Sequence, residues 1–362
     1  MPAVLIAALS GRALAAAARR DGYAPLVADL FGDADTAALA AANEVVPGSL
    51  RRGLAAPPLR AALDRLAAGR APVGVVYGSG FEGRPALLRA LARYRLLGTP
   101  AAVVARLKDP FAFAALCQAA GVPHPEVARA PDGRGEWLEK RAGAAGGGHI
   151  RPARGRVRAP RYLQRRVAGR AVAALLLGDG RRALTLGFSE QWTAPTAEAP
   201  FRYGGAAQPA ALTGAQAASL AAAAEGVAAS AGVVGLASAD FLLRADGFDL
   251  LEINPRPGAS LDVFIAAPLF AWHVASCDGR LPGRAPLFAA AAAASVVYAR
   301  RAGTVPEGFA WPDWAADRQR PGPVAAGAPI ATVHAGGADA AAARAAAARR
   351  TAELLARIGD AP

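Results

Sequence analysis

The chain has 362 residues, 54% of them hydrophobic, and a formal net charge of +13 at pH 7, and this length allows two or three compact domains or one composite enzyme body. The basic residues are spread along the whole chain, so nucleic-acid binding is not favoured as the main function. The two cysteines, Cys117 and Cys277, have no CxxC spacing and make no disulfide framework, which is typical of a reducing compartment.

The start of the chain, "MPAVLIAALSGRALAAAARR", lacks the basic segment of a signal peptide. The longest uncharged run near the C-terminus, "APLFAAAAAASVVYA", is shorter than the roughly 20 apolar residues that a membrane span needs. We therefore expect a cytoplasmic protein that has neither a membrane nor a nucleic acid as its partner.

The first hundred residues predict a doubly wound α/β sheet. Residues 3–9 form a predicted buried strand, 11–22 a helix and 24–31 a second strand, which is a βαβ beginning. The first turn holds only Ser10-Gly11 instead of G-x-G-x-x-G, so a dinucleotide-binding dehydrogenase is not favoured. A further strand in 71–85 runs into a glycine-rich turn that carries Glu82.

Three acidic residues follow the second predicted strand, in the segment "ADLFGDADT". Asp29, Asp33 and Asp35 end that strand, where ligands of α/β sheets often bind. A capped loop before a helix explains them equally well. The sequence leaves these two interpretations open.

Helices and short strands are predicted to alternate after residue 100. The segment 107–121 is a predicted helix that ends at Gly121, because two prolines follow within four residues. Paired strands with a Gly-Asp-Gly turn are predicted in 161–190, and an alanine-rich helix in 214–232. The remainder is predicted to contain two strands, "ASVVYA" and "PIATVHA", a loop or linker in 299–327 and a terminal helix.

Lysine is scarce in a chain that otherwise uses arginine. Only Lys108 and Lys140 are lysines among the 41 basic residues. A compact ammonium on a flexible stem is suited to reaching a phosphate oxygen. Chance survival of a lysine codon is the alternative explanation for either residue alone.

The strand "LLEINPRPGAS" (250–260) carries polar side chains on one face. A preceding strand and the turn Ala245-Asp246-Gly247 predict a hairpin with a three-residue loop and Gly247 in the left-handed position. This loop pairs Arg244 with Phe248, Leu242 with Leu250 and Asp240 with Glu252.

The predicted pairing places the carboxylates of Asp240 and Glu252 opposite each other, with Asn254 on the same face. Facing carboxylates repel unless a cation lies between them. Carboxylate and amide oxygens favour Mg²⁺ or Mn²⁺, which takes its remaining ligands from water and substrate phosphates. The hairpin therefore predicts a metal–nucleotide site. Its alternative is a surface hairpin with unrelated charges.

A glycine-rich loop follows Lys140 in "EKRAGAAGGGHI" (139–150). The backbone N–H groups of Gly146, Gly147 and Gly148 can approach a phosphate closely because they carry no Cβ. The segment is not a Walker A sequence, and by itself it also fits a plain flexible surface loop.

Together these motifs resemble the ATP-grasp superfamily of carboxylate–amine ligases, and the resemblance covers most of the chain. Its most specific part is the hairpin "DFL…LLEINPRPG". The resemblance implies an α/β (α+β) ATP-grasp fold with an N-terminal βαβ pre-ATP-grasp domain. The implied domains are a Rossmann-like domain (1–100), a small lobe with the glycine-rich loop (101–165), a large lobe with the metal hairpin (166–300) and a C-terminal extension packing on the body (301–362).

The resemblance also implies roles for individual residues of this sequence. Asp240, Glu252 and Asn254 would bind two Mg²⁺ ions, or Mn²⁺ in their place, that bridge the ATP phosphates. Lys140 and Arg256 would be catalytic. The implied ATP-binding residues are Lys108, Lys140, Gly146, Gly147, Gly148, His149, Gln164, Arg165 and Val167. The implied substrate residues are Ser10, Glu82, Arg202, Tyr203 and Gly204.

Two positions depart from the pattern of the superfamily. Ala171 stands where many members have an acid for the ribose hydroxyls, and Arg141 replaces a proline that often follows the loop lysine. The order Lys108-Asp109 also reverses the usual one. These departures affect the nucleotide contacts and leave the metal positions filled.

The implied activity is an ADP-forming ligase that activates a carboxylate as an acyl phosphate and joins it to an amine. The segments "ADLFGDADT", "YGSGFEGRP" and "WPDWAAD" resemble predicted carboligases, including tyramine–glutamate ligases of methanofuran-type cofactor biosynthesis. The partners would be a small carboxylate and an amine, and a homodimer is compatible with the resemblance. The alternatives are a biotin carboxylase-like enzyme, a regulatory ATP-binding protein and a basic nucleic-acid-binding protein.

Overall fold

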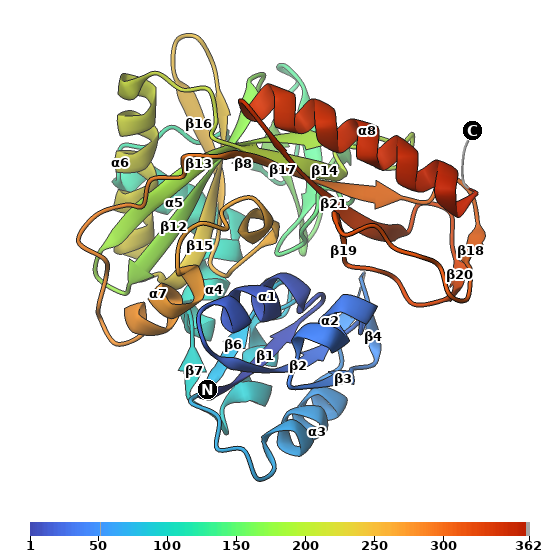
Figure 1. Ribbon diagram of the computed structural model, residues 1–362. Helices are drawn as coiled ribbons and strands as arrows, with labels where there is room; N and C mark the ends of the chain where they lie inside the picture. Colours follow the sequence, from blue (N-terminus) through green and yellow to red (C-terminus); the bar gives the residue numbers. More distant parts are fainter. Residues whose placement is uncertain (51, 360–362) are drawn as a thin grey trace.

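A five-stranded parallel sheet forms the N-terminal part of the computed structural model, which describes residues 1–50 and 52–359 (Figure 1). The strand order is β3-β2-β1-β6-β7, and all neighbouring pairs are parallel. The predicted βαβ beginning is therefore confirmed. The strands are β1 (Ala3–Ala8), β2 (Ala24–Asp29), β3 (Ala42–Val45), β6 (Val75–Tyr77) and β7 (Leu96–Leu97).

Helices cover both faces of this sheet because its strands are apolar on both sides. One face packs against α3 (Ala56–Ala67) and the 3-10 helix η1 (Pro85–Leu91). The other face packs against α1 (Arg12–Arg20). The helix α2 (Ala34–Leu39) follows β2, and the short strands β4 (Gly48–Ser49) and β5 (Gly53–Leu54) pair with each other.

A four-stranded antiparallel sheet follows two helices in the chain. The helices are α4 (Ala101–Lys108) and α5 (Pro110–Ala119). The sheet has the order β10-β9-β11-β8, and the turn from β9 to β10 contains the glycine loop, defined here as residues 142–150. Its strands are β8 (Val127–Ala128), β9 (Trp137–Arg141), β10 (Arg151–Pro152) and β11 (Arg161–Arg165).

An eight-stranded sheet makes the largest part of the molecule. Its order is β16-β15-β12-β13-β14-β17-β21-β19, and every neighbouring pair is antiparallel. Its first strand in the sequence, β12, follows directly after β11 of the small sheet. Its strands are β12 (Arg170–Asp179), β13 (Ala183–Thr193), β14 (Tyr203–Gln208), β15 (Val234–Leu243), β16 (Phe248–Asn254), β17 (Ala291–Tyr298), β19 (Ala315–Ala316) and β21 (Pro329–Gly337).

Each end of the large sheet has its own helical cover (Figure 1). The helices α4, α5 and α6 (Gly214–Ala231) pack on β12, β15 and β16, where α6 begins with a capping box at Thr213 and ends at the left-handed Gly232. The helix α8 (Ala340–Ile358) covers β17 and β21. The strands β18 (Gly303–Val305) and β20 (Gly322–Val324) form a separate pair.

The predicted helix 107–121 and the predicted linker 299–327 differ from the structure. Asp109 ends α4 and accepts hydrogen bonds from the backbone N–H groups of Phe111 and Ala112, so it caps a second helix that starts at Pro110. The linker region contains β18, β19 and β20. Both errors arise because cap and pairing contacts were not visible from hydropathy.

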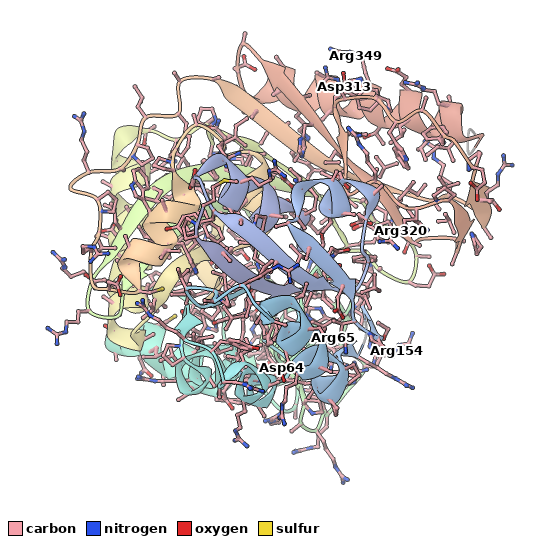
Figure 2. All side chains as sticks on the ribbon, turned by 60° about the horizontal axis from the view of Figure 1, so that its bottom comes forward. Asp64, Arg65, Arg154, Asp313, Arg320 and Arg349 are labelled. Carbon is pink, nitrogen blue, oxygen red and sulfur yellow. The ribbon has the colours of Figure 1, made fainter. Side chains whose placement is uncertain are left out.

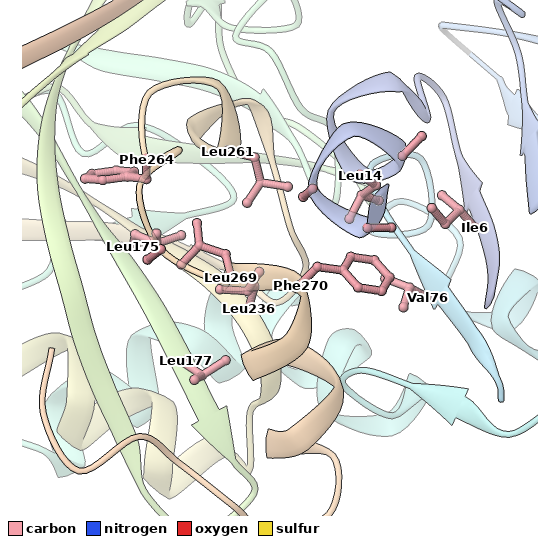
Figure 3. Packing of buried hydrophobic residues seen from close by; sticks show 14 of the residues in the cluster. Ile6, Leu14, Val76, Leu175, Leu177, Leu236, Leu261, Phe264, Leu269 and Phe270 are labelled. Carbon is pink, nitrogen blue, oxygen red and sulfur yellow. The ribbon is translucent and has the colours of Figure 1, made fainter. Parts of the chain in front are cut away.

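One apolar cluster joins the N-terminal sheet to the large sheet (Figure 3). Ile6 of β1 and Leu14 of α1 meet Leu175 and Leu236 of the large sheet through Phe270, which lies on α7 (Leu269–Ser276). This packing fixes the position of β1 relative to the hairpin formed by β15 and β16. Among the described residues, no helix has the length and the apolar character needed to cross a membrane.

A buried guanidinium links three distant segments of the chain. Arg12 on α1 donates to both carboxylate oxygens of Asp262, at 2.5 and 2.7 Å, and to Asp317, at 2.9 and 3.1 Å. Asp262 belongs to the 3-10 helix η2 (Ala259–Asp262), which follows the hairpin. The ion pairs tie the N-terminal and C-terminal parts to the region after β16.

Arg12→Ala is expected to lower the free energy of unfolding by about 3 kcal/mol or more, because it leaves buried carboxylates without their cation. Arg20→Ala, an exposed position on the same helix, should change it by about 0.5 kcal/mol or less. Urea denaturation of the two variants measures the difference. Equal midpoints would show that Arg12 does not hold these segments together.

Candidate functional site

A cavity of about 1940 Å³ lies where the three sheets meet. All of the predicted site residues except Gly204 line it, with the hairpin strands on one side and the glycine loop on another. Concave sites between packed domains are common places for small ligands. The structure therefore brings residues that are far apart in the sequence to one enclosed space.

The hairpin has the predicted register at its functional end and a different one near its turn. Asp240 pairs with Glu252, as expected, and Ser238 pairs with Asn254. Phe241, however, pairs with Leu250, so the predicted pairing of Leu242 with Leu250 is wrong.

The difference in register comes from a β-bulge next to Asp240, where Leu251 is the extra residue of β16. The bulge compensates for a turn one residue longer than predicted, because the strands close at Leu243 and Phe248. Gly247 has a φ of 158°, which is nearly extended and not left-handed helical.

Lys108 lies among the acidic and amide groups of the hairpin. Its Nζ donates to Glu252 Oε2 at 2.7 Å and to Asn254 Oδ1 at 2.6 Å. Asn254 Nδ2 in turn donates to Asp240 Oδ2 at 3.0 Å. The lysine at the end of α4 is thus the cation that offsets the repulsion between the two facing carboxylates.

The pKa values of the two hairpin carboxylates are shifted in opposite directions. Burial and the charge of Glu252 raise the pKa of Asp240. Burial would also raise the pKa of Glu252, but Lys108, Lys140 and Arg256 together outweigh it and lower that pKa below its ordinary value. The pair therefore carries less negative charge than two free acids, and a further cation would allow Asp240 to ionise.

Lys140 lies beside the hairpin, on β9. Its Nζ donates to Gln164 Oε1 at 2.5 Å, and Gln164 Nε2 is 3.4 Å from His124 Nε2. Burial lowers the pKa of Lys140, and it lowers the pKa of His124 to about 4, so this imidazole is neutral at pH 7. Lys140 thus lies beside two neutral polar groups in the cavity wall.

The glycine loop is closed over the cavity by close backbone contacts. Tyr203 N donates to Gly146 O at 2.9 Å. A Cβ on Gly147, which has a φ of 72°, would lie 1.8 Å from the carbonyl oxygen of Phe201. A Cβ on Gly143 would lie 2.3 Å from Glu82 O. Only glycine fits at these two positions, because a side chain would push the loop away from both walls.

His149 ends the glycine loop with an unpaired nitrogen. Its Nδ1 is buried and has no hydrogen-bond partner among the described residues. Burial lowers the pKa of His149 to about 4, which leaves the ring neutral at pH 7. A buried, unpaired ring nitrogen in a cavity is suited to receiving a polar ligand.

Arg256 and Glu82 form a buried ion pair on the opposite wall. Arg256 Nε donates to Glu82 Oε1 at 2.6 Å, and the N–H groups of Gly80 and Phe81 donate to Glu82 Oε2 at 2.8 and 3.1 Å. Burial would raise the pKa of Glu82, but Arg256, Lys108 and the hydrogen bonds to its oxygens together outweigh burial and lower this pKa. Glu82 therefore orients the guanidinium of Arg256, and both of its oxygens are already bonded.

The remaining predicted residues lie at the edges of the cavity. Arg165 stacks on Trp137 and pairs with Glu126 and Asp132, so its side chain is bound within the small sheet. Arg202 stacks on Tyr298 at 3.7 Å. Val167, Gly148 and Ser10 also line the cavity, whereas Gly204, on β14, is not part of its lining.

Two site residues were not found from the sequence. Gln191 Nε2 donates to Asp240 Oδ1 at 3.2 Å from β13, but an isolated polar residue in a strand gives no signal of which face it occupies. Arg12 was one of many arginines. Only its position on the apolar α1, next to the first strand, could have indicated burial.

The oxygens of Asp240, Glu252 and Asn254 fit Mg²⁺ in their chemistry, since all three ligand types suit a hard divalent cation. They do not form a complete metal shell. Within residues 1–50 and 52–359, no group of three or more His, Cys, Asp or Glu side chains is arranged to hold a metal. The missing ligands would have to be water and phosphate oxygens, and Lys108 stands in for the positive charge.

The sequence of residues 109–260 matches the family model described as "ATP-grasp domain". No protein of curated function matches the chain in sequence. The fold, by contrast, has many counterparts among solved structures.

Three solved structures illustrate the likeness. Rhizobium etli pyruvate carboxylase matches with a TM-score of 0.72 at 16% identity, over 99% of this chain and 39% of its own length, so this chain spans well under half of that enzyme. The biotin carboxylase domain of Hydrogenobacter thermophilus 2-oxoglutarate carboxylase, a dimer with MgADP and bicarbonate, matches at 0.72 and 13%, over 98% and 89%. Thermotoga maritima N5-carboxyaminoimidazole ribonucleotide synthetase matches at 0.66 and 14%, over 97% and 98%.

These comparisons confirm the predicted α/β ATP-grasp fold with an N-terminal parallel-sheet domain. The chain carries an ATP-grasp domain. At identities of 13–16%, the likeness to the three structures establishes the fold alone.

Lys108→Met is expected to destabilise the ligand-free protein by about 1–3 kcal/mol, because the facing carboxylates lose their cation; the partial exposure of Glu252 reduces the effect. Mg²⁺ should then raise the melting temperature of this variant more than that of the wild type. Arg106→Met, exposed on the same helix, is the control. Equal responses to Mg²⁺ in all three proteins would contradict the role of Lys108 as a stand-in cation.

Proposed function

We propose that this chain is an ATP-dependent, ADP-forming ligase that activates a carboxylate as an acyl phosphate and joins it to an amine. The observation that supports it most is the meeting of Asp240, Glu252 and Asn254 with Lys108 and Lys140 at one cavity, beneath a closed glycine loop. The match of residues 109–260 to the ATP-grasp domain also supports an ATP-dependent reaction.

The proposed reaction has two steps. A carboxylate oxygen of the first substrate attacks the γ-phosphorus of ATP, the bond to the β-phosphate oxygen breaks, and ADP leaves. The amine nitrogen of the second substrate then attacks the acyl carbon, the C–O bond to phosphate breaks, and the nitrogen loses a proton as phosphate departs. Phosphoryl transfer of this kind needs positioning and charge neutralisation more than covalent chemistry from the protein.

The cations around the cavity supply that neutralisation. Lys140 and Lys108 would contact the phosphates of ATP, and Arg256, oriented by Glu82, would face the carboxylate and the departing phosphate. Mg²⁺ held by Asp240, Glu252 and Asn254 would supply charge stabilisation for the β- and γ-phosphates. With a metal ion to balance Glu252, Lys108 would be free to turn from this carboxylate to the phosphates of the nucleotide.

The glycine loop would exclude water from the acyl phosphate. Its contacts with Glu82 and Phe201 at Gly143 and Gly147 hold it against two walls of the cavity. Hydrolysis of the activated carboxylate would waste ATP, so a closed loop favours transfer to the amine. The adenine would lie at the strand end formed by Gln164, Arg165 and Val167, with backbone contacts, because the Arg165 side chain is engaged elsewhere.

Glutamate and tyramine are the first substrates that we propose to test, because the segments "ADLFGDADT", "YGSGFEGRP" and "WPDWAAD" resemble tyramine–glutamate ligases. Release of ADP and phosphate, measured with glutamate and a small panel of amines, identifies the pair. ADP released only in the presence of both a carboxylate and an amine supports the ligase.

Carboxylation with bicarbonate is the second candidate function. It is favoured by the structural likeness to the biotin carboxylase domain of Hydrogenobacter thermophilus and to the Thermotoga maritima synthetase. The same assay separates the two functions. ADP released with bicarbonate, and independent of the other carboxylates, supports a carboxylase.

Glu252→Ala is expected to reduce ADP formation by about 100-fold or more, because one carboxylate of the metal site is lost. Asp246→Asn removes a charge from the exposed turn of the same hairpin, where the side chain is 83% exposed, and should leave the rate within about twofold. Near-normal turnover by Glu252→Ala, with an unchanged circular dichroism spectrum, would contradict the role of Glu252 as a metal ligand.

A further inference from the structure

Five carboxylates gather at the end of the cavity that is formed by β2, α1 and the segment around residue 317. Two guanidinium groups lie among them. Arg12 contacts Asp262 and Asp317. Arg320, labelled in Figure 2, lies beside Gly32, and its positive charge partly offsets the effect of burial on the pKa of Asp29. The acids therefore exceed the arginines, in a chain whose net charge is +13. The five are Asp29, Asp33, Asp35, Asp262 and Asp317.

Three of these acids have structural roles that use their oxygens. Asp29 accepts from the N–H groups of Gly11 and Gly32 at 3.0 and 2.9 Å. Asp35 accepts from the N–H groups of residues 317 and 318 at 2.9 and 3.0 Å. Asp262 is bound by Arg12 through both of its oxygens.

Asp317 is held in an unusual backbone conformation at the edge of the cavity. Its φ is 49°, a left-handed value that few side chains adopt, and Asp35 fixes its N–H. Its carboxylate accepts from Ser10 Oγ at 3.1 Å and from Arg12. Carboxylate oxygens have several lone pairs, so Asp317 can accept a further donor.

Asp33 is the acid of this group that lacks a partner. It is 6% exposed and lines the cavity, and among the described residues its carboxylate makes no hydrogen bond. Buried polar groups are nearly always paired, with protein or with a ligand. An unpaired, nine-tenths buried carboxylate that faces a cavity beside other acids is suited to receiving a cation.

We propose that the acidic pocket, formed by Ser10, Asp33 and Asp317, binds a positively charged nitrogen of the second substrate. The proposal rests on the proposed ligase in one respect, namely that the cation belongs to its amine substrate. It narrows that substrate to a small cationic amine. The carboxylate substrate and ATP belong to the other end of the cavity, where the lysines and Arg256 lie.

The chemistry of the pocket favours an ammonium group over a metal ion. A primary ammonium has three donors, and Asp33, Asp317 and the lone pairs of Ser10 Oγ offer acceptors on the same part of the cavity wall. A divalent metal ion would need free carboxylate oxygens, but Arg12 already engages the oxygens of Asp262 and Asp317, and backbone N–H groups engage those of Asp35. A cation at this position would lower the pKa of Asp33 and allow its carboxyl to ionise, which a neutral ligand cannot do.

The acidic surroundings of Asp33 make its contribution to stability depend on pH. Burial and the charges of Asp317, Asp29 and Asp35, opposed by Arg12, raise the pKa of Asp33 to about 8. The unfolded chain releases this proton near pH 4, so the native state holds the extra proton between about pH 4 and about pH 8, and the contribution of Asp33 to stability falls as pH rises through this window.

Asp33→Asn removes this penalty. The melting temperature of the variant, minus that of the wild type, is therefore expected to increase from about pH 5 to about pH 8 and then level off. Asp313→Asn, an exposed acid beside the C-terminal helix (Figure 2) and not part of the cavity lining, should show no such trend. A constant difference across this range would mean that Asp33 is not held in an acidic environment.

Calorimetric titration without nucleotide, at about pH 8, tests the pocket itself. The probes are methylammonium, 1,4-diaminobutane and tyramine, with 4-ethylphenol as the neutral counterpart of tyramine. At least one amine is expected to bind the wild type and to bind Asp33→Asn about tenfold more weakly or worse. Asp313→Asn should bind like the wild type, and 4-ethylphenol should bind weakly to all three.

The proposal is overturned if none of the amines binds, if Asp33→Asn binds them as well as the wild type does, or if 4-ethylphenol matches tyramine. These results are independent of catalysis. Amine binding through Asp33 without ADP formation would support the amine-binding pocket and contradict the ligase activity. ADP formation without amine binding at Asp33 would support the ligase activity and contradict the pocket.

Discussion

The electrostatic balance around the hairpin is the constraint on which the rest of the structure depends. Pairing β15 with β16 in this register places Asp240 opposite Glu252, and two facing, partly buried carboxylates are tolerated only beside positive charge. Lys108 supplies it from the end of α4. The break between α4 and α5 at Asp109 sets where that lysine points, so a helix cap and a metal site are linked through one side chain.

The same constraint explains the distribution of charge in the cavity. Lys140 and Arg256 lie around the hairpin, where a nucleotide would bring negative phosphates. Asp33, Asp262 and Asp317 lie at the other end, where Arg12 is the internal counter-ion. An anionic and a cationic substrate would thus bind at opposite ends of the cavity before they react. The closed glycine loop lies over the end that would bind the anionic substrate.

Much of the fold could be predicted from the sequence, because periodic apolar strands and turn residues carry local information. The βαβ start, the α6 helix and the pairing of Asp240 with Glu252 were all accessible in this way. The β-bulge at Leu251 was not, since it depends on how the whole strand fits its neighbours. The pairing of Glu82 with Arg256, the contact of Gln191 with Asp240 and the burial of Arg12 also depend on tertiary contacts between distant segments, which hydropathy and spacing do not contain.

Calorimetric titration of the wild-type protein with ATP, with and without Mg²⁺, tests the central claim most directly, because it needs no knowledge of the other substrates. The account predicts that ATP binds with micromolar affinity in Mg²⁺ and at least about tenfold more weakly when the metal is chelated, since the phosphates and the hairpin carboxylates would then repel each other. Equal ATP affinity in both conditions would contradict the assignment of Asp240, Glu252 and Asn254 as a metal–nucleotide site.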